Sequence, residues 1–252
     1  MTKIPKSHPR YYSLITREKI SNAMEKGIVH KTGLIAHGRG EAFDYLIGET
    51  TIPVADEAEK VAATLLITAK NPVISVNGNV VALASKECIK LSNITNSKIE
   101  VNLFHRTKKR MDAIINELLK KGAKKVYGKK ADAKIPGLDH GRALCDLEGI
   151  YSSDVILIPL EDGDRCKALK KMDKTVITID LNPLSRTSKT ADVTIVDNVV
   201  RAIPNITTWV KKLKSLNQND LNKIIKSWNN KDKLNDVLSF ISKRLSLINN
   251  GV

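Results

Sequence analysis

From residue 72 onward, short runs of β-branched and aliphatic residues alternate with amphipathic stretches. Six such runs occur, as PVISV, KIEV, KKVY, DVILIP, KTVITI and DVTIV. Most are separated by roughly 10 to 15 residues of helical pattern, which is the spacing of βαβ units. Strands that are apolar on both faces are typical of parallel sheets covered by helices on two sides. The pattern therefore predicts an α/β fold with a mostly parallel, open sheet of six strands.

The chain before residue 71 shows only helical patterns. Thr16 is expected to cap a helix that Gly27 ends, and Pro53 is expected to open another. Tight backbone turns are expected between them, at the closely spaced glycines Gly33, Gly38 and Gly40. We therefore expect a helical segment at residues 1–70, an α/β core at 71–215 and a helical segment at 216–252, packed as one compact domain.

The composition adds a strong positive charge to this picture. The 252 residues include 42 Lys and Arg against 27 Asp and Glu, a net charge of +15, with 42% hydrophobic residues. These proportions exclude a disordered or collagen-like chain and predict attraction to anions. No apolar run approaches the roughly 20 residues of a membrane helix, and no signal peptide is readable, so we expect a cytoplasmic protein without a membrane partner.

Cysteine usage argues against disulfides and zinc. Cys88, Cys145 and Cys166 are odd in number, far apart and outside any CxxC pair. They are expected to be reduced thiols that line the core.

The basic residues gather in three segments. Residues 1–31, 105–134 and 211–244 carry net charges of +5, +8 and +6. The last is most simply the solvated face of a helix. In the second, HRTKKR places cations at the start of a predicted helix, where the helix dipole disfavours them. That placement favours a phosphate site, although exposed lysines tolerated at a small cost would explain it too.

In open α/β sheets, ligands bind beside the carboxyl ends of the strands. The loops after the first two strands are therefore candidates for binding a phosphorylated substrate, through Asn77, Gly78, Asn79, His105, Arg106 and Thr107. Gly78 would let the backbone approach the ligand, and the amides of the helix start would face its charge. A glycine turn with an Asn cap is the alternative for the first loop, and His105 could simply pack.

Two later loops carry further polar groups. EDGD supplies Glu161, Asp162 and Asp164, weak candidates for Mg²⁺ that helix capping explains equally well. DLNPLSRT places acceptors, an amide, hydroxyls and a cation within eight residues, namely Asp180, Asn182, Ser185, Arg186 and Thr187. Arg17 lies at a helix start and Arg39 lies between two glycines, where a guanidinium could reach a polyphosphate.

Common catalytic signatures are missing. The chain has no GxxxxGK[ST], GxGxxG, HExxH or GxSxG motif. A nucleic-acid-binding α/β protein is an alternative because of the charge, but aromatic residues make up only 4% of the chain. A nicotinamide-dependent oxidoreductase is a weaker alternative, because the chain lacks the GxGxxG pattern of dinucleotide-binding proteins. The sequence leaves open whether His37 and His140 do chemistry or pack.

Several long strings resemble one family. IPKSHPRYYSLITREKI, GLIAHGRGEAFDYLIGE, VISVNGN, NLFHRT, IDLNPLSRT and VDNVVRAIPN occur in order between about residues 4 and 210. They resemble the archaeal 4-phosphopantoate–β-alanine ligases, also called phosphopantothenate synthetases. The resemblance implies a Rossmann-like fold, a homodimer and a role in coenzyme A biosynthesis. It implies the ATP-dependent coupling of 4-phosphopantoate to β-alanine, giving 4′-phosphopantothenate, AMP and pyrophosphate, with no specific nucleic acid as partner.

The resemblance also implies where ATP binds. The matching positions are Arg17, Arg39, Asp180, Leu181, Asn182, Arg186, Thr187, Asn198 and Val199. It assigns no catalytic residue, for which Arg39, His105 and Arg106 are our candidates. A carboxylate must be activated before an amine attacks it, so we expect an acyl-adenylate intermediate, with Mg²⁺ assisting and arginines offsetting the repulsion between anions.

Overall fold

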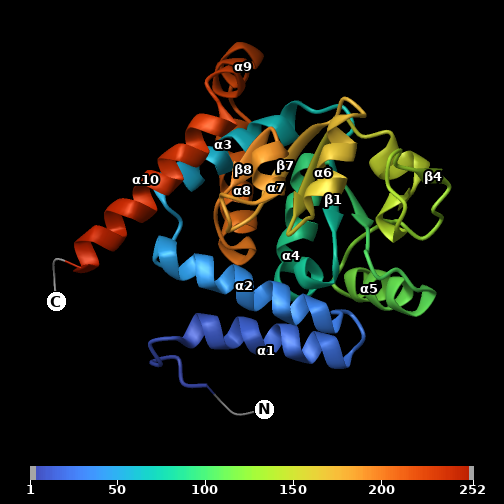
Figure 1. Cartoon of the computed structure of the whole chain (residues 1–252). Helices are drawn as coiled ribbons and strands as arrows, with labels where there is room; N and C mark the ends of the chain where they lie inside the picture. The colour runs from blue at the N-terminus through green and yellow to red at the C-terminus, as the bar shows by residue number, and fades with distance from the viewer. Residues whose placement is uncertain (1–3, 250–252) are drawn as a thin grey trace.

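The computed structural model describes residues 4–249, and ten α-helices surround a central sheet in that part of the chain (Figure 1). The helices are α1 (Tyr11–Glu25), α2 (Lys31–Ile47), α3 (Pro53–Thr68), α4 (Gly78–Thr95), α5 (Lys108–Lys120), α6 (Gly163–Lys170), α7 (Arg186–Thr190), α8 (Val199–Leu213), α9 (Gln218–Lys226) and α10 (Asn230–Asn249).

The sheet has six strands in the order β3-β2-β1-β6-β7-β8, and every adjacent pair is parallel. The strands are β1 (Val73–Val76), β2 (Lys98–Val101), β3 (Val126–Tyr127), β6 (Val155–Pro159), β7 (Thr175–Ile179) and β8 (Val193–Ile195). All six lie in the predicted apolar runs, so the α/β, Rossmann-like prediction is confirmed. The strand order reverses between β1 and β6, where ligands bind in such sheets.

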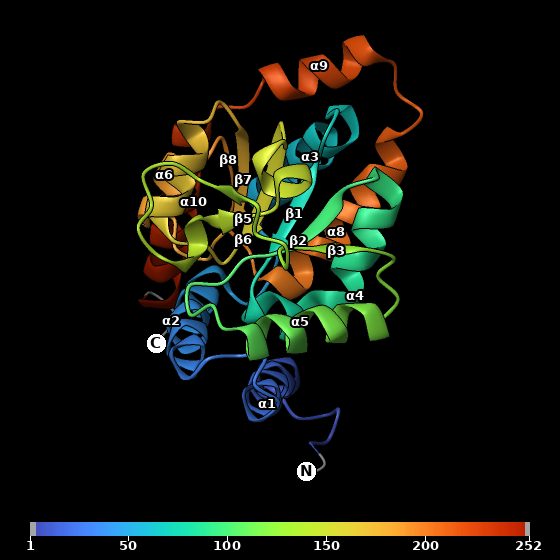
Figure 2. The same cartoon turned by 90° about the vertical axis from the view of Figure 1, so that its right-hand side faces the viewer.

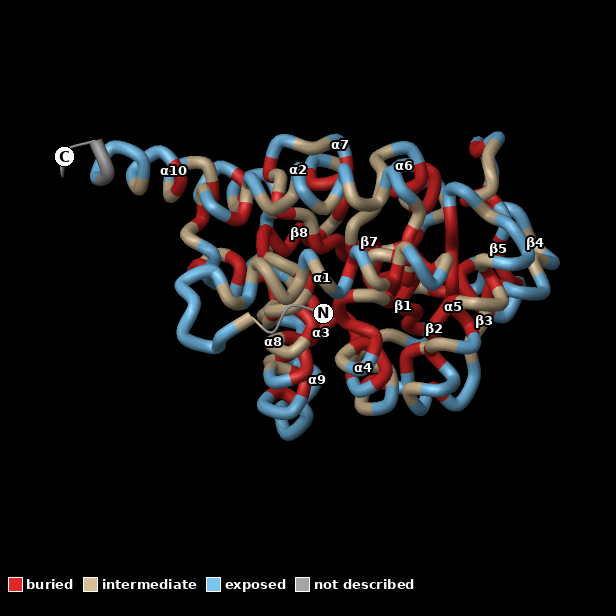
Figure 3. Tube along the Cα trace, turned by 90° about the horizontal axis from the view of Figure 1, so that it is seen from below, coloured by how far each residue is buried: buried red, intermediate tan, exposed pale blue. Residues whose placement is uncertain are grey.

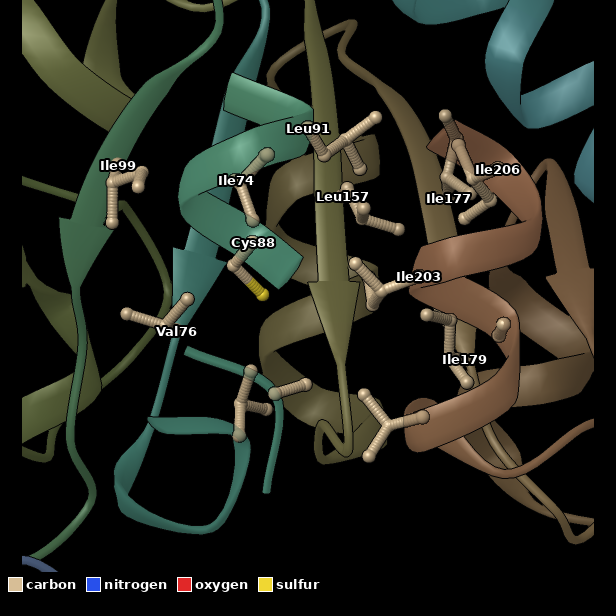
Figure 4. Close-up of a cluster of buried hydrophobic side chains, with 14 of the residues drawn as sticks. Ile74, Val76, Cys88, Leu91, Ile99, Leu157, Ile177, Ile179, Ile203 and Ile206 are labelled. Carbon is tan, nitrogen blue, oxygen red and sulfur yellow. The ribbon is translucent and has the colours of Figure 1, made fainter. Parts of the chain in front are cut away.

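Successive residues of a strand belong to two apolar layers, one on each face of the sheet. Ile74 and Leu157 belong to the larger cluster, with side chains of α3, α4, α5 and α8, whereas Val73 and Ile156 belong to a second cluster with α6. Figure 4 shows the larger layer between the sheet and its helices, with Cys88 inside it. This two-sided burial follows from the period of two along a strand. The three cysteines are free and buried, as predicted.

α1 and α2 lie below the carboxyl ends of the strands (Figure 1), where α1 packs on α4 and α2 contacts both α4 and α10. Figure 2, turned by 90°, keeps α1 and α2 at this same edge, on the far side of the sheet from α9. Seen from below, the buried residues form a continuous band through the strands, and exposed residues follow the outer helices (Figure 3). The amino-terminal helices therefore cover the edge of the sheet where ligands are expected.

Two predictions about the amino-terminal segment were wrong. α1 begins at Tyr11 rather than at Thr16, whose hydroxyl instead donates to the carbonyl oxygen of Ser13 within the helix. Gly33, Gly38 and Gly40 do not make turns, because they lie inside the continuous helix α2. Packing accounts for one of them: a Cβ on Gly33 would lie 2.4 Å from Oδ1 of Asn79. The predicted end of α1 at Gly27 (φ +70°) and the helix opened by Pro53 are confirmed.

The long polar connection after β3 contains more structure than its pattern suggests. It holds a small antiparallel pair, β4 (Ala133–Lys134) and β5 (Leu144–Cys145), with a 3₁₀ turn at Gly141–Ala143 and an irregular helical turn at Leu147–Tyr151. The segment returns Arg142 to the carboxyl edge of the sheet. Among the described residues, no helix has the length and apolar content needed to cross a membrane.

Candidate active site

A cavity lies at the carboxyl edge of the sheet, between α2 and the loops after β1, β2, β6, β7 and β8. We call it the first cavity. Seven residues singled out from the sequence line it: Asn77, Gly78, Asn79, His105, Leu181, Asn198 and Val199. The opposite wall is the α2 stretch from Thr32 to Glu41. The parallel topology thus brings the predicted loops together at the switch point.

Asn77 holds the two central strands together at this point. Its Oδ1 accepts a hydrogen bond from the amide of Val80 at 3.1 Å and so caps α4. Its Nδ2 donates to the carbonyl oxygen of Leu160, at the end of β6, at 3.0 Å. Leu160 has a φ of +56°, a left-handed conformation that is costly without glycine. Asn77 therefore has a structural task in addition to lining the cavity.

The glycine of the same loop allows a close approach of protein backbone. A Cβ on Gly78 would lie 2.3 Å from the carbonyl oxygen of Ile28, in the α1–α2 connection. Asn79 also contacts protein, since its Nδ2 donates to the carbonyl oxygen of Gly33 at 2.8 Å. Both residues fasten α2 to the start of α4 and thereby fix the width of the first cavity.

Of the three candidates in the loop after β2, one lines the first cavity and two make hydrogen bonds within the protein. Arg106 points away from the cavity and donates to the carbonyl oxygen of Gly128 at 2.5 Å. Thr107 caps α5 by accepting from the amide of Arg110 at 3.2 Å. His105 lines the cavity and stacks on His30 with ring centroids 3.9 Å apart. Of the three, only His105 reaches the cavity.

Arg110 enters the cavity wall in place of Arg106. Its Nη1 donates to the carbonyl oxygen of His105 at 2.6 Å, and its Nη2 donates to that of Ile28 at 2.9 Å. Because both acceptors are neutral, the guanidinium keeps its full charge for an anion. Burial and the neighbouring charges of His105 and Arg110 lower the pKa of His30, which faces the same space.

The three arginines expected at ATP lie at this edge of the molecule but outside the lining of the cavity. Arg17 forms a salt bridge of 2.9 Å with Glu41. Arg186 begins α7 and pairs with Asp164 at 2.5 Å. Arg39 is exposed on α2, near enough to Asp180 for its charge to oppose the rise in the pKa of that carboxyl, which burial causes.

The rest of the predicted ATP segment is mostly engaged within the protein. Asp180 accepts the amide of Asn182 at 2.9 Å and the hydroxyl of Ser185, which shapes the loop after β7. Thr187 is buried and donates to the carbonyl oxygen of Glu161. Leu181, Asn198 and Val199 are the ATP candidates that reach the cavity.

The acidic loop EDGD binds arginines. Glu161 is buried against Arg142 and Arg165, with Nη1 of Arg142 2.8 Å from Oε2. Asp162 caps α6 and lies 2.9 Å from Nε of Arg142, while Asp164 pairs with Arg186 as described above. Within residues 4–249, no group of three or more His, Cys, Asp or Glu side chains is placed to hold a metal ion. These carboxylates therefore do not fit a protein-held Mg²⁺ site.

A second cavity adjoins the first on the other side of α2. Its lining combines cations and acids from α1, α2 and α8, including Arg10, Lys19, Arg201, Glu41 and Asp44. Three residues line both cavities, namely His37, Glu41 and Asn198. The two spaces therefore meet at the middle of α2 and the start of α8.

The start of α8 is held by a buried polar network. Asp197 accepts the amide of Asn198 at 2.6 Å and the Nε of Arg201 at 2.7 Å. Arg201 also reaches Asp44 on α2 at 2.5 Å. Glu59 on α3 is completely buried beside Asp197, and burial together with that neighbouring charge raises the pKa of Glu59 to about 9. The network ties three helices to the Asn198 turn.

Comparison with known proteins identifies the family. Residues 54–244 match the family model described as phosphopantothenate/pantothenate synthetase. The chain belongs to this family. It is 53% identical over 252 residues to the 4-phosphopantoate–β-alanine ligase of Thermococcus onnurineus, covering 100% of this chain and 97% of that one.

Further members of the synthetase family agree along nearly the whole length. The 4-phosphopantoate–β-alanine ligase of Thermococcus kodakarensis is 51% identical, over 98% of this chain and 95% of its own. The one from Methanosarcina mazei is 52% identical, over 97% and 96%. The prediction of a ligase enzyme from the resemblance is therefore confirmed.

Three residues that line the first cavity were not among the predicted site residues. Arg142 lines the first cavity but comes from a segment with no periodic pattern. Arg110 was noted only as part of a basic cluster, and its place on the inner face of α5 was the available signal. His37 was left open between chemistry and packing; its position one helical turn before Glu41 places both on one face of α2.

Proposed function

We propose that this synthetase joins 4-phosphopantoate and β-alanine in an amide bond at the expense of ATP, giving 4′-phosphopantothenate, AMP and pyrophosphate through an acyl-adenylate. The observation that carries the proposal is the full-length relationship to proteins named 4-phosphopantoate–β-alanine ligase. The product serves coenzyme A biosynthesis. The positive charge of Arg110 and the free amides at the start of α4, both beside the first cavity, support this proposal.

The inner end of the first cavity suits a phosphorylated acid. In the first turn of α4 the amides of Gly78 and Asn79 lack intrahelical partners, and Arg110 adds a charge that no carboxylate among the described residues offsets. His30 and His105 supply two further ring nitrogens beside it. We place the phosphate of 4-phosphopantoate here, at Asn77, Gly78, Asn79 and His105 together with Arg110. Arg106 and Thr107 have scaffold roles in this arrangement.

ATP is proposed to lie toward α8 and the loop after β7. Leu181 and Val199 provide an apolar wall, and Asn198 begins a helix whose first amides face anions. Arg39 stands at the rim near Asp180. Arg17 and Arg186 would exchange the carboxylates of Glu41 and Asp164 for phosphates of ATP. Any Mg²⁺ would arrive on the triphosphate, since the EDGD acids already bind arginine.

Catalysis under this proposal needs no covalent attachment to the enzyme. The carboxylate oxygen attacks the α-phosphorus of ATP, pyrophosphate leaves, and the amine then attacks the carbonyl carbon of the adenylate. Cationic groups lower the repulsion between the carboxylate and the triphosphate. A cysteine nucleophile is not required, and burial raises the pKa of Cys88, Cys145 and Cys166 to about 12, so these thiols stay protonated. The side chains around the two cavities bind and align reactants.

The test is a defined reaction with product analysis. Purified protein, ATP, Mg²⁺ and 4-phosphopantoate are incubated with and without β-alanine, and nucleotides and amide product are quantified by chromatography and mass spectrometry. We expect one AMP and one pyrophosphate per 4′-phosphopantothenate, with sustained turnover only when β-alanine is present. Formation of ADP and phosphate would replace the adenylate by an acyl-phosphate, and no amide product would reject the function.

We also propose that the protein forms a homodimer, as the resemblance implies. Large apolar side chains are exposed on the amino-terminal helices, with Tyr12 84% and Ile35 73% accessible. Light scattering of the purified protein should give twice the mass of 27.9 kDa. A double change of Tyr12 and Ile35 to Ser should reduce the dimer if these helices form the contact, whereas a monomeric wild type would reject it.

A further inference from the structure

We infer that the second cavity receives β-alanine and that His37 takes the proton from its amine. The inference rests on the proposed ligase function and adds the site and the base for its second half-reaction. Three residues, His37, Glu41 and Asn198, line both cavities. A group at this junction can act on a molecule in one cavity that reacts with a molecule in the other.

The second cavity has the charges that a short zwitterion needs. Arg10, just before α1, and Lys19 of α1 provide cations for a carboxylate, and neither forms a salt bridge with an acid among the described residues. Glu41 and Asp44 of α2 line the same cavity; they already pair with Arg17 and Arg201, so a bound ammonium group would share these carboxylates. Glu41 also borders the first cavity, whereas Arg10 and Lys19 line the second cavity only, at and just before α1. A bound β-alanine would thus direct its nitrogen toward the acyl group.

His37 lies where that nitrogen must lose its proton. Its Nε2 is buried and has no hydrogen-bond partner within residues 4–249. A buried ring nitrogen without a partner is unusual in a protein, because its lost hydration is not replaced, and it calls for an explanation. Acceptance of a proton from a bound ammonium supplies one.

The charges around the imidazole keep it able to accept that proton. Burial is the largest influence and lowers the pKa of His37. Glu41 and Asp44 on α2 act in the opposite direction, and Arg17 on α1 acts with burial. Arg201 of α8 lines the same cavity but is paired with Asp44 and Asp197. His37 is therefore neutral near pH 7 and ready to act as a base.

The step balances without any added reactant. Nε2 of His37 takes one proton from the ammonium, and the nitrogen lone pair attacks the acyl carbon. The bond from that carbon to the adenylate oxygen breaks, and its electron pair stays on AMP. The second proton leaves the nitrogen for water as the amide forms, and the imidazolium returns its proton to solvent.

The decisive experiment separates activation from amine attack. The His37→Gln variant is given ATP, Mg²⁺ and 4-phosphopantoate, with either β-alanine or hydroxylamine, which is already unprotonated at neutral pH. We expect hydroxamate formation within about threefold of wild type but ligation of β-alanine at least 100-fold slower. The control is His140→Gln, since His140 also has a buried ring nitrogen without a partner among the described residues but lies outside both cavities.

Other outcomes overturn the inference. Equal loss of both products in a folded variant would place His37 in activation, and retention of both would remove it from the reaction. A wild type that forms neither hydroxamate nor 4′-phosphopantothenate would instead reject the proposed function itself, and a wild type that ligates β-alanine but forms no hydroxamate would leave the wild-type pH profile to decide. If His37→Gln fails to fold, the wild-type pH profile decides. With His37 as base, kcat/KM for β-alanine is flat from about pH 7 to 8.5, whereas without a base it rises about tenfold per pH unit, following the ammonium.

Discussion

The side-chain amide of Asn77 donates to the carbonyl oxygen of Leu160 over 3.0 Å, across the switch point of the sheet. The bond joins the ends of β1 and β6, the two strands between which the strand order reverses. The same side chain caps α4 through its oxygen. One residue thus fixes both the helix start where we propose that the substrate phosphate binds and the strained turn at Leu160, which also lines the first cavity.

Replacement of Asn77 separates these two tasks. Asn77→Ala removes both and should lower the free energy of unfolding by about 1–3 kcal/mol. Asn77→Ser keeps a capping oxygen but loses the donor to Leu160, so it should recover about 1 kcal/mol of stability while the KM for 4-phosphopantoate remains raised. Urea unfolding and steady-state kinetics measure the two effects. Equal stability of the two variants would mean that the cap contributes little.

The glycines of α2 should respond in opposite directions to alanine. A Cβ on Gly38 would meet no atom of the described residues within 4 Å beyond its own stretch of helix, so Gly38→Ala should stabilise the helix by about 0.5–1 kcal/mol. Gly33→Ala would place a methyl group 2.4 Å from Oδ1 of Asn79, which then loses its bond to the carbonyl of residue 33. It should lower both the melting temperature and kcat/KM. Thermal unfolding of Gly38→Ala and Gly33→Ala measures whether the melting temperature rises in the first variant and falls in the second.

Arg39 is expected to act on ATP and not on the fold. It is exposed on α2, so Arg39→Ala should leave the melting temperature within about 2 °C of wild type. Loss of a charge-assisted contact with phosphate should reduce kcat/KM for ATP roughly 10- to 100-fold. Lys214→Ala, at the exposed end of α8, is the matched control and should change neither. A large loss of stability in Arg39→Ala would assign that side chain to the scaffold.

Glu59 should make the protein less stable as the pH rises. The folded chain keeps this proton up to about pH 9, whereas an exposed glutamate loses it near 4.5. Between these values the unfolded state binds fewer protons, so the free energy of unfolding falls with rising pH, by up to about 1.4 kcal/mol per unit from this group.

Denaturant unfolding at pH 6 and pH 8 tests the assignment. Glu59→Gln keeps the neutral shape and should reduce the slope, while Glu25→Gln, an exposed residue at the end of α1, should retain the wild-type slope. An unchanged slope in Glu59→Gln would show that another group holds the proton.

The strands could be predicted because parallel strands buried on both faces leave an unmistakable apolar run. The helix α2 could not, because three glycines within eight residues favour turns locally, whereas the helix is held by packing on α1, α4 and α10 and by the bond from Asn79 to the carbonyl oxygen of Gly33. Gly78 was correctly placed at the switch point, but its partner proved to be Ile28. The position of Arg142 in the cavity wall could not be predicted from the sequence either, because it depends on a loop that folds back across the sheet.

The fate of the substrate carboxylate oxygens distinguishes an acyl-adenylate from an acyl-phosphate. 4-Phosphopantoate labelled with ¹⁸O in both carboxylate oxygens is converted with ATP and β-alanine, and the products are analysed by mass spectrometry. An acyl-adenylate predicts one ¹⁸O in each AMP and one in the amide carbonyl, with none in pyrophosphate. Unlabelled AMP, or ¹⁸O in inorganic phosphate beside ADP, would contradict the account.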